Sequence, residues 1–162
     1  MILYFLRHGQ AEPAGHGDDA ARRLTVEGET VLKAAATLWR RLNLRPDVVL
    51  TSPLARARRT AEIVCEELRL PSGPTADDRL RPGAGWSDLA QAMAGHGDAR
   101  RVMFVGHEPD LSAAAAHLTG AASIRLRTGG MACLEFYGIP EPGGGELAWL
   151  LDPDLYGDTE GD

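Results

Sequence analysis

Three short runs of apolar residues recur along the chain, at residues 1–6, 47–52 and 101–107. Each run is nearly unbroken, a pattern typical of strands that are covered on both faces of a parallel sheet. Near the end of the sequence, residues 131–139 and 146–151 flank the glycine-rich segment PEPGGG. This arrangement predicts two strands joined by a turn, so we expect a mostly parallel sheet with a C-terminal hairpin.

Helical patterns separate the apolar runs. Residues 26–43 carry apolar side chains at helical spacing behind Thr25, a residue type that caps helix N-termini well. A second pattern follows the segment TSP, and a third begins near Pro109, which suits the first position of a helix. Strands alternating with helices predict an α/β fold, a three-layer sandwich with helices on both faces of the sheet. We expect a single domain over residues 1–151, followed by a loose acidic tail over residues 152–162.

Composition narrows the class of protein. A chain of 162 residues can bury a core without disulfide or metal staples. The net charge of −6 argues against a nucleic-acid partner, because phosphate-backbone affinity requires a surplus of lysine and arginine. No apolar run approaches the roughly 20 residues that span a bilayer, and the opening lacks the basic start of a secretory signal. We therefore expect a cytoplasmic monomer away from membranes, in which Cys65 and Cys133 are buried free thiols.

Polar residues of a reactive kind follow each of the three apolar runs. In an open α/β sheet, ligands bind beyond the carboxyl ends of the strands. Three strands would therefore deliver two arginines and two histidines to one edge of the sheet. The residues concerned are Arg7, His8 and Gly9 after the first run, Ser52, Pro53 and Arg56 after the second, and Gly106, His107 and Glu108 after the third.

This set of residues suits phosphoryl transfer. A positive charge beside an imidazole lowers its pKa, so Arg7 would help to keep His8 neutral and able to attack phosphorus. Arg7 and Arg56 can bind phosphoryl oxygens, and His107 would stand at the start of a helix, whose N-terminus favours anions. We expect the negative charge of Glu108 to complement the dipole of the same helix. We assign His16, His96 and His117 to loops or to a solvated helix face.

The motifs RHG, TSPLARARRTAE and VGHEP, in this order, resemble those of the histidine phosphatase superfamily, also called the phosphoglycerate mutase-like family. The short chain and the segment RRLTVEG close behind the first motif are most similar to its SixA branch, the protein phosphohistidine phosphatases. The resemblance runs from residue 1 to about residue 150. It implies that His8 becomes transiently phosphorylated and that Arg7, Arg56 and His107 complete the phosphate pocket. Arg22 matches a basic position that can reach the same pocket, and no metal or organic cofactor is implied.

The chain departs from the wider superfamily at one point. Members that act on phosphate esters usually carry a glutamate after the middle motif as the acid for the departing alkoxide, whereas the comparable region here, PTADDRLRPGAGW, contains none. A phosphorylated imidazole can take its proton from water, so the departure favours phosphohistidine, carried on a protein, as the substrate. Two alternatives stay open. The protein could hydrolyse small phosphate monoesters with Asp77 or Asp78 as the acid, or it could bind phosphate without turnover.

Overall fold

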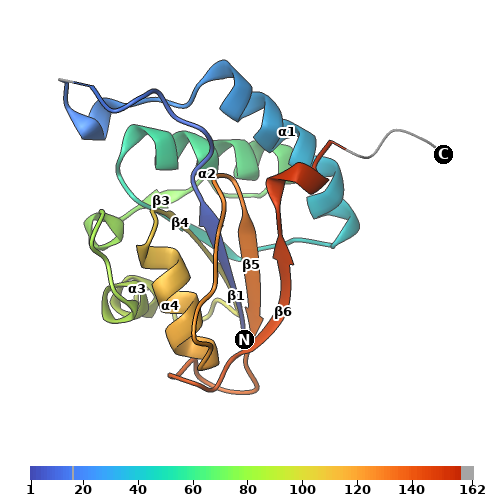
Figure 1. Cartoon of the computed structure of the whole chain (residues 1–162). Coiled ribbons are helices and arrows are strands. Elements are labelled where there is room, and N and C mark those ends of the chain that lie inside the picture. The colour runs from blue at the N-terminus through green and yellow to red at the C-terminus, as the bar shows by residue number, and fades with distance from the viewer. Residues whose placement is uncertain (16, 158–162) are drawn as a thin grey trace.

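The computed structural model describes residues 1–15 and 17–157, so His16 and residues 158–162 lie outside it. Within the described residues, six strands form one sheet in the order β3-β2-β4-β1-β5-β6 (Figure 1). The pairs β1–β4, β4–β2 and β2–β3 are parallel, whereas β5 pairs antiparallel with both β1 and β6. The mostly parallel sheet and the C-terminal hairpin are therefore confirmed. The strands are β1 (Ile2–Arg7), β2 (Val48–Thr51), β3 (Thr75–Ala76), β4 (Arg101–Gly106), β5 (Met131–Glu135) and β6 (Glu146–Leu151).

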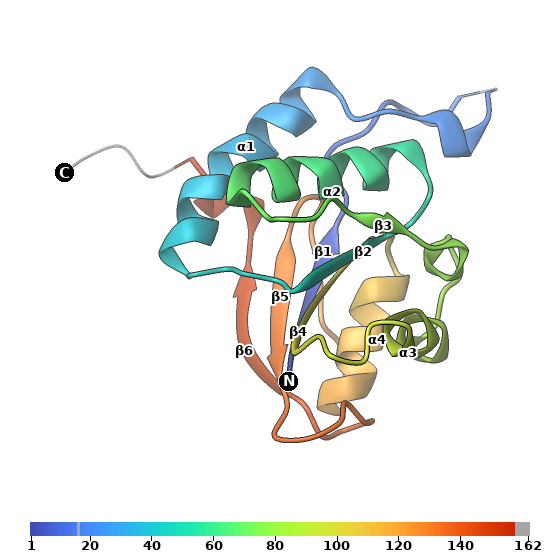
Figure 2. The same ribbon diagram turned by 180° about the vertical axis from the view of Figure 1, so that it is seen from behind.

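Helices cover both faces of this sheet, as Figures 1 and 2 show from opposite sides. Along β1, Tyr4 and Leu6 join the core beneath the first two helices, whereas Leu3 and Phe5 join the core beneath the last two. The strand is apolar throughout because both of its faces are buried, which confirms the predicted three-layer sandwich. The helices are α1 (Val26–Arg41), α2 (Ala55–Leu68), α3 (Trp86–Ala94) and α4 (Asp110–Thr119).

The helix ends agree with the sequence signals at one helix and differ at another. Thr25 caps α1 as predicted, because its hydroxyl oxygen accepts the Gly28 N–H at 2.9 Å. Gly28 also lets α1 approach the chain that follows β1, since a Cβ there would lie 2.3 Å from the carbonyl oxygen of Gln10. Pro109, expected at the first helical position, is instead the N-cap, and α4 begins one residue later.

The expectation of a loose tail from residue 152 onward is wrong for the described part of that segment. A short 3₁₀ helix (Pro153–Leu155) leads to Tyr156, which is 2 % exposed. The Tyr156 hydroxyl donates to the carbonyl oxygen of Gly129 at 2.9 Å, and its ring packs edge-on against Trp39. Burial of one large aromatic ring holds this segment on the domain, although the residues around it are polar and acidic. Residues 158–162 of the expected tail lie outside the described residues.

Several smaller expectations can be compared with the described residues. Cys65 and Cys133 are buried and unpaired, as predicted, and burial raises their pKa values to about 11 and about 12. No helix in the described part of the chain is long and apolar enough to cross a membrane. Residues 1–15 and 17–157 contain no group of three or more side chains placed to hold a metal ion.

Candidate active site

The carboxyl ends of β1, β2 and β4 meet at one edge of the sheet. The register pairs Arg7 with Gly106 and Thr51 with Val105, so the residues that follow these strands emerge side by side. The His8 N–H donates to the carbonyl oxygen of Gly106 at 3.1 Å, which carries this pairing past the end of β1. The structure therefore brings His8, Arg56 and His107 together, as the sequence predicted.

His8 presents one ring nitrogen for attack. Its Nδ1 lies 2.8 Å from the carbonyl oxygen of Gly9, and because a carbonyl can only accept, Nδ1 carries the proton. The lone pair on Nε2 then accepts the Arg56 Nε–H at 3.2 Å. Burial above all, and then the charges of Arg56 and Arg7, lower the pKa of His8 to about 4. The imidazole is therefore neutral near pH 7, as a nucleophile must be.

His107 lies against His8 from the neighbouring strand end, with their rings edge to face and centroids 5.3 Å apart. Its Nε2 lies 2.8 Å from the hydroxyl oxygen of Ser52, and this hydroxyl also accepts the Leu54 N–H at 3.3 Å. The Ser52 proton is free to point at Nε2, an arrangement that favours the His107 tautomer with its proton on Nδ1. Burial lowers the pKa of His107 to about 4, helped by repulsion from His8 when that ring is protonated and by the charge of Arg56.

Two arginines border the histidines and are held by different parts of the chain. Arg56, in the first turn of α2, is buried; besides His8 it donates to both the backbone and the side chain of Asp19. Arg7, at the end of β1, donates from one terminal nitrogen to the carbonyl oxygen of Leu126 at 3.1 Å.

Two donors at this edge are buried without a protein partner among the described residues. They are Nε of Arg7 and Nδ1 of His107. Buried polar groups are nearly always hydrogen-bonded, so such orphans in one small region require a ligand or water to satisfy them. Both are donors beside a neutral imidazole. An anion with several oxygen atoms, such as a phosphoryl group, matches that arrangement.

Arg22 reaches this site only through another residue. Its side chain donates to the carbonyl oxygen of Glu12 at 2.8 Å and to the carboxylate of Asp19 at 2.7 Å, and it makes no direct bond to the histidines. Asp19 thus joins Arg22 to Arg56. Sequence reasoning missed Asp19. The only signal was an acidic pair inside an arginine-containing loop, and such pairs are common on solvated surfaces.

Gly9, directly after His8, is required by the packing of the core. A Cβ at this position would lie 2.7 Å from a methyl group of Leu32 and 3.3 Å from one of Leu24. The absent side chain makes room for the core, and the Gly9 N–H donates to the hydroxyl of Thr60 in α2 at 3.0 Å. These contacts fix the backbone beside His8.

Each of the two aspartates considered as an acid pairs with an arginine. Both oxygens of Asp77 accept from the guanidinium of Arg79, and this hydrogen bonding holds the pKa of Asp77 below its usual range. Asp78 is mostly exposed and pairs with Arg81. Glu108 accepts from the backbone and the hydroxyl of Ser112 in the first turn of α4, and burial raises its pKa.

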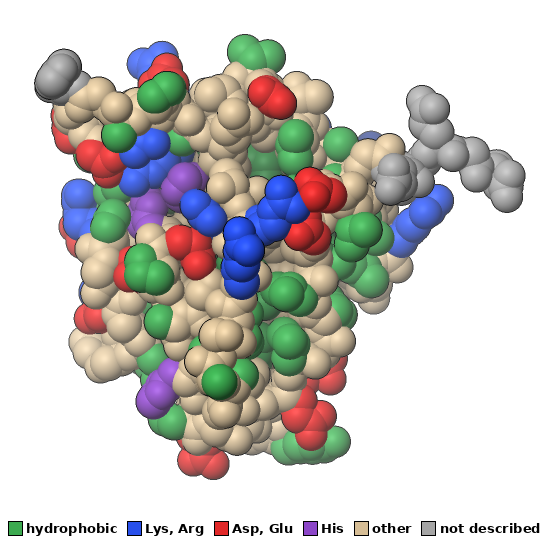
Figure 3. All heavy atoms as spheres, viewed as in Figure 1, with side chains coloured by type: hydrophobic (Ala, Val, Ile, Leu, Met, Phe, Trp, Pro, Cys, Tyr) green, Lys and Arg blue, Asp and Glu red, His purple; other side chains and the backbone are tan. Residues whose placement is uncertain are grey.

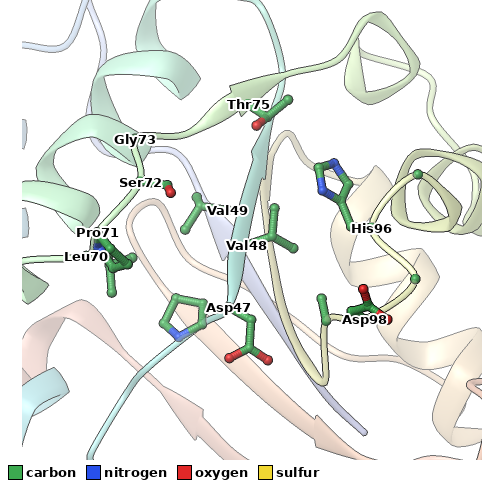
Figure 4. Close-up of a pocket in the computed structure, with 14 residues that line it drawn as sticks. Asp47, Val48, Val49, Leu70, Pro71, Ser72, Gly73, Thr75, His96 and Asp98 are labelled. Carbon is green, nitrogen blue, oxygen red and sulfur yellow. The ribbon is translucent and has the colours of Figure 1, made fainter.

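Arg7 and His8 are partly exposed, so the site opens to solvent. Figure 3 shows histidine side chains beside basic and acidic ones on one face of the molecule. A separate hollow of about 520 Å³ lies at the opposite, amino edge of the sheet. In Figure 4, Leu70–Gly73 line one side of it and His96 and Asp98 the other, with Val48 and Val49 between them. It shares no residue with the site at the carboxyl edge.

Comparison with known proteins agrees with this geometry. The model of the histidine phosphatase superfamily (branch 1) matches residues 3–83, half of the chain. The chain belongs to the histidine phosphatase superfamily. Superfamily members similar to it include the phosphohistidine phosphatase SixA of Escherichia coli strain K12, 28 % identical over 157 residues and 94 % of each chain. An uncharacterized protein of Picosynechococcus sp. is 42 % identical over 118 residues, 68 % of each chain.

Among solved structures, the protein histidine phosphatase SixA complexed with tungstate matches with a TM-score of 0.81 and 27 % identity. The match covers 96 % of this chain and 99 % of that one. It confirms the fold expected from the resemblance. Together with the superfamily match, it supports phosphatase activity.

Proposed function

We propose that the protein hydrolyses phosphohistidine, carried on a protein, through an intermediate in which Nε2 of His8 is phosphorylated. The observation that carries this proposal is the state of His8: a neutral imidazole whose one ring lone pair accepts a hydrogen bond from Arg56, beside two buried donors without protein partners among the described residues. The similarity to SixA over nearly the whole chain supports the same substrate class.

In the first step, the phosphoryl group binds between the two arginines and Nδ1–H of His107. Arg56 turns its Nε–H from His8 to a phosphoryl oxygen, which frees the lone pair on Nε2 for in-line attack. The bond from Nε2 to phosphorus forms while the bond from phosphorus to the substrate imidazole breaks. The electron pair of the broken bond goes to the nitrogen of the leaving imidazole, whose other ring nitrogen has already taken a proton from water, so a neutral imidazole departs and a hydroxide ion remains.

In the second step, a water molecule attacks the phosphorus of the phosphorylated His8. The bond to Nε2 breaks and its electron pair returns to the imidazole. Dihydrogen phosphate leaves with the oxygen and both protons of that water, and one of these protons neutralises the hydroxide formed in the first step. Arg7, Arg56 and His107 hold the three other oxygens through both steps, so the charge of each loose transition state is offset by fixed donors. Arg22 contributes by holding Asp19 against Arg56.

The leaving group is the reason to favour a phosphorus–nitrogen bond over an ester. An alkoxide needs an acid placed to protonate it, whereas an imidazole can be protonated by water. Asp77 is ionised and tied to Arg79, so it has no proton to give, and Asp78 is paired in solvent. These contacts speak against the small-ester alternative with either aspartate as the acid.

The test measures phosphate release from a phosphohistidine-bearing protein and from p-nitrophenyl phosphate, together with acid-labile phosphate on the enzyme. We expect a strong preference for the first substrate, acid-labile labelling of the unmodified protein, and loss of both with His8→Ala. His117→Ala, on the exposed side of α4, is the matched control and should keep full activity.

The other outcomes separate the alternatives. Preference for the ester would show that the argument from the missing acid is wrong. Phosphate binding without any labelled enzyme, from either substrate, would favour a binding module and overturn the proposal.

A further inference from the structure

Asp19 is brought to the mouth of the site by a loop that closes on itself. The loop between β1 and α1 is pinned at its base by a bridge between Ala11 and Leu24 and by the Arg22 side chain on the carbonyl oxygen of Glu12. At its far end, a 3₁₀ turn (Asp19–Ala21) lies against α2, where Arg56 donates to the Asp19 carbonyl oxygen at 2.8 Å. The backbone of Asp19 is therefore fixed as well as its side chain.

The Asp19 carboxylate is held by two arginines and is also exposed to solvent. One oxygen accepts from Arg56 at 3.0 Å and the other from Arg22 at 2.7 Å, yet the side chain is 57 % exposed. These two hydrogen bonds keep the pKa of Asp19 below its usual range, so the group is charged at neutral pH. Its outer face is free to meet a further donor.

The carboxylate also lies near the attacking nitrogen, because both contact Arg56. Arg56 contacts Nε2 of His8 with Nε and Asp19 with a terminal nitrogen of the same guanidinium. Given the size of that planar group, the carboxylate lies no more than about 9 Å from the attacking nitrogen. In-line transfer places the leaving group on the side of phosphorus away from His8. Because Asp19 contacts the same guanidinium that would bind the phosphoryl group, a fixed negative charge lies beside that group.

We propose that Asp19 selects the leaving group: its carboxylate accepts a hydrogen bond from the ring N–H of a phosphorylated imidazole and repels substrates with a second negative charge beside the phosphoryl group. The inference rests on the proposed function and deepens it. An imidazole protonated on its free nitrogen is a cationic donor and a better leaving group, so a nearby carboxylate favours it. Asp19 accepts this hydrogen bond and transfers no proton, because the proton on the ring comes from water.

A role limited to bracing Arg56 would act differently. Arg56 holds the phosphoryl group, which all substrates share, so a lost brace changes every rate by a similar factor. A selecting carboxylate changes one substrate relative to another. Ratios of kcat/KM between substrates therefore separate the two roles, whatever happens to the rates themselves.

The experiment compares Asp19→Asn with the unmodified protein on three substrates: phosphoimidazole, p-nitrophenyl phosphate and phosphoglycolate. We expect the kcat/KM ratio of phosphoimidazole to p-nitrophenyl phosphate to fall about tenfold, and that of phosphoglycolate to p-nitrophenyl phosphate to rise several-fold. Asp18→Asn is the control, because it removes the same charge one residue away and an asparagine can still accept the Ala20 N–H. Both of its ratios should match the unmodified protein.

Unchanged ratios in Asp19→Asn would overturn the inference, whether all three rates fall together or rise together. If the unmodified protein forms the acid-labile phosphoenzyme and only the ratios stay constant, the inference fails and the proposed function stands. If no substrate labels the unmodified protein, both fail. Thermal unfolding of the two variants, followed by circular dichroism, verifies that each is folded under the assay conditions.

Discussion

Both edges of the sheet carry polar and charged side chains, but the two edges differ in whether those groups have hydrogen-bond partners among the described residues. At the amino edge, the hollow in Figure 4 is bordered by Asp47, whose carboxylate accepts the N–H groups of Arg100 and Arg101 and the Arg101 guanidinium. At the carboxyl edge, Arg7 and His107 bury donor nitrogens that no described protein group satisfies. The first edge uses its polar groups to hold the strands together, and the second keeps them available. Two unsatisfied buried donors beside each other indicate a ligand site more directly than a hollow alone does.

The largest expected effect is a difference in activity between a variant of His8, at the carboxyl edge, and a variant of His96, at the amino edge. We expect His8→Ala to lower kcat by about a thousandfold or more, because the nucleophile is lost. His96→Ala, in the amino-edge hollow, should stay within about twofold of the unmodified protein. Steady-state phosphate release under identical conditions measures both. A large loss in His96→Ala would break the comparison between the edges.

The next effect concerns the arginines. Arg7→Lys keeps the charge and loses the planar pair of donors, so we expect kcat/KM to fall about a hundredfold. Arg101→Lys at the amino edge should leave kcat/KM alone and lower the free energy of unfolding by about 1 kcal/mol or less, since its ion pair with Asp47 is partly exposed. Kinetics and urea unfolding of both variants test the contrast. Equal kinetic losses would contradict it.

A smaller effect tests the proton on His107. Ser52→Ala removes the hydroxyl that faces Nε2, so we expect roughly a tenfold loss in kcat and a shift of the ring proton to a mixture of Nδ1 and Nε2. Ring ¹⁵N chemical shifts report the tautomer directly. Ser72→Ala, in the amino-edge hollow, is the matched control and should change neither quantity. A tautomer that is the same with and without Ser52 would show that the serine only supports the structure.

The smallest expected effect is on stability as a function of pH. Burial lowers the pKa values of His8 and His107 to about 4, below the ordinary value of 6.5. Between these values the unfolded chain binds more protons than the folded one, so stability is complete above about pH 6.5 and falls as the pH drops toward 4. The loss at pH 5.5 should be on the order of 1 kcal/mol for each histidine.

Urea unfolding at pH 7.5, 6.5 and 5.5 measures this loss, with His8→Gln as the comparison. The variant should lose its share of the pH dependence. An identical slope in the variant and the unmodified protein would mean that folding leaves the pKa of His8 unchanged, because only a group whose pKa changes on folding contributes to the slope. That result would contradict the lowered pKa that keeps the imidazole neutral below pH 6.5.

The sequence predicted those parts of the site that directly follow an apolar run, and missed features that have no local pattern. His8, Arg56 and His107 each follow an apolar run, and parallel strands end at one edge, so the order of runs along the chain is enough to predict that they meet. The strand β3 was not assigned, because its two residues cannot show a period. The helix α3 was not assigned either, since it is short and buries only Leu89 and Ala92. Tyr156 stands among polar and acidic residues, and only its packing against Trp39 marks it as part of the core.

The sequence by itself determined the order of the longer strands and of helices α1, α2 and α4, the edge of the sheet where the reactive side chains gather and the kinds of side chain found there. These features follow from apolar periodicity and from residues that stand next to each other in the chain. Only the tertiary structure decided which nitrogen of His8 has the lone pair and which nitrogen of His107 carries the proton. It alone also shows that Asp19 reaches Arg56 across 37 positions. Hydrogen bonds of this kind depend on orientation to within a fraction of an ångström, and packing of distant segments sets that orientation.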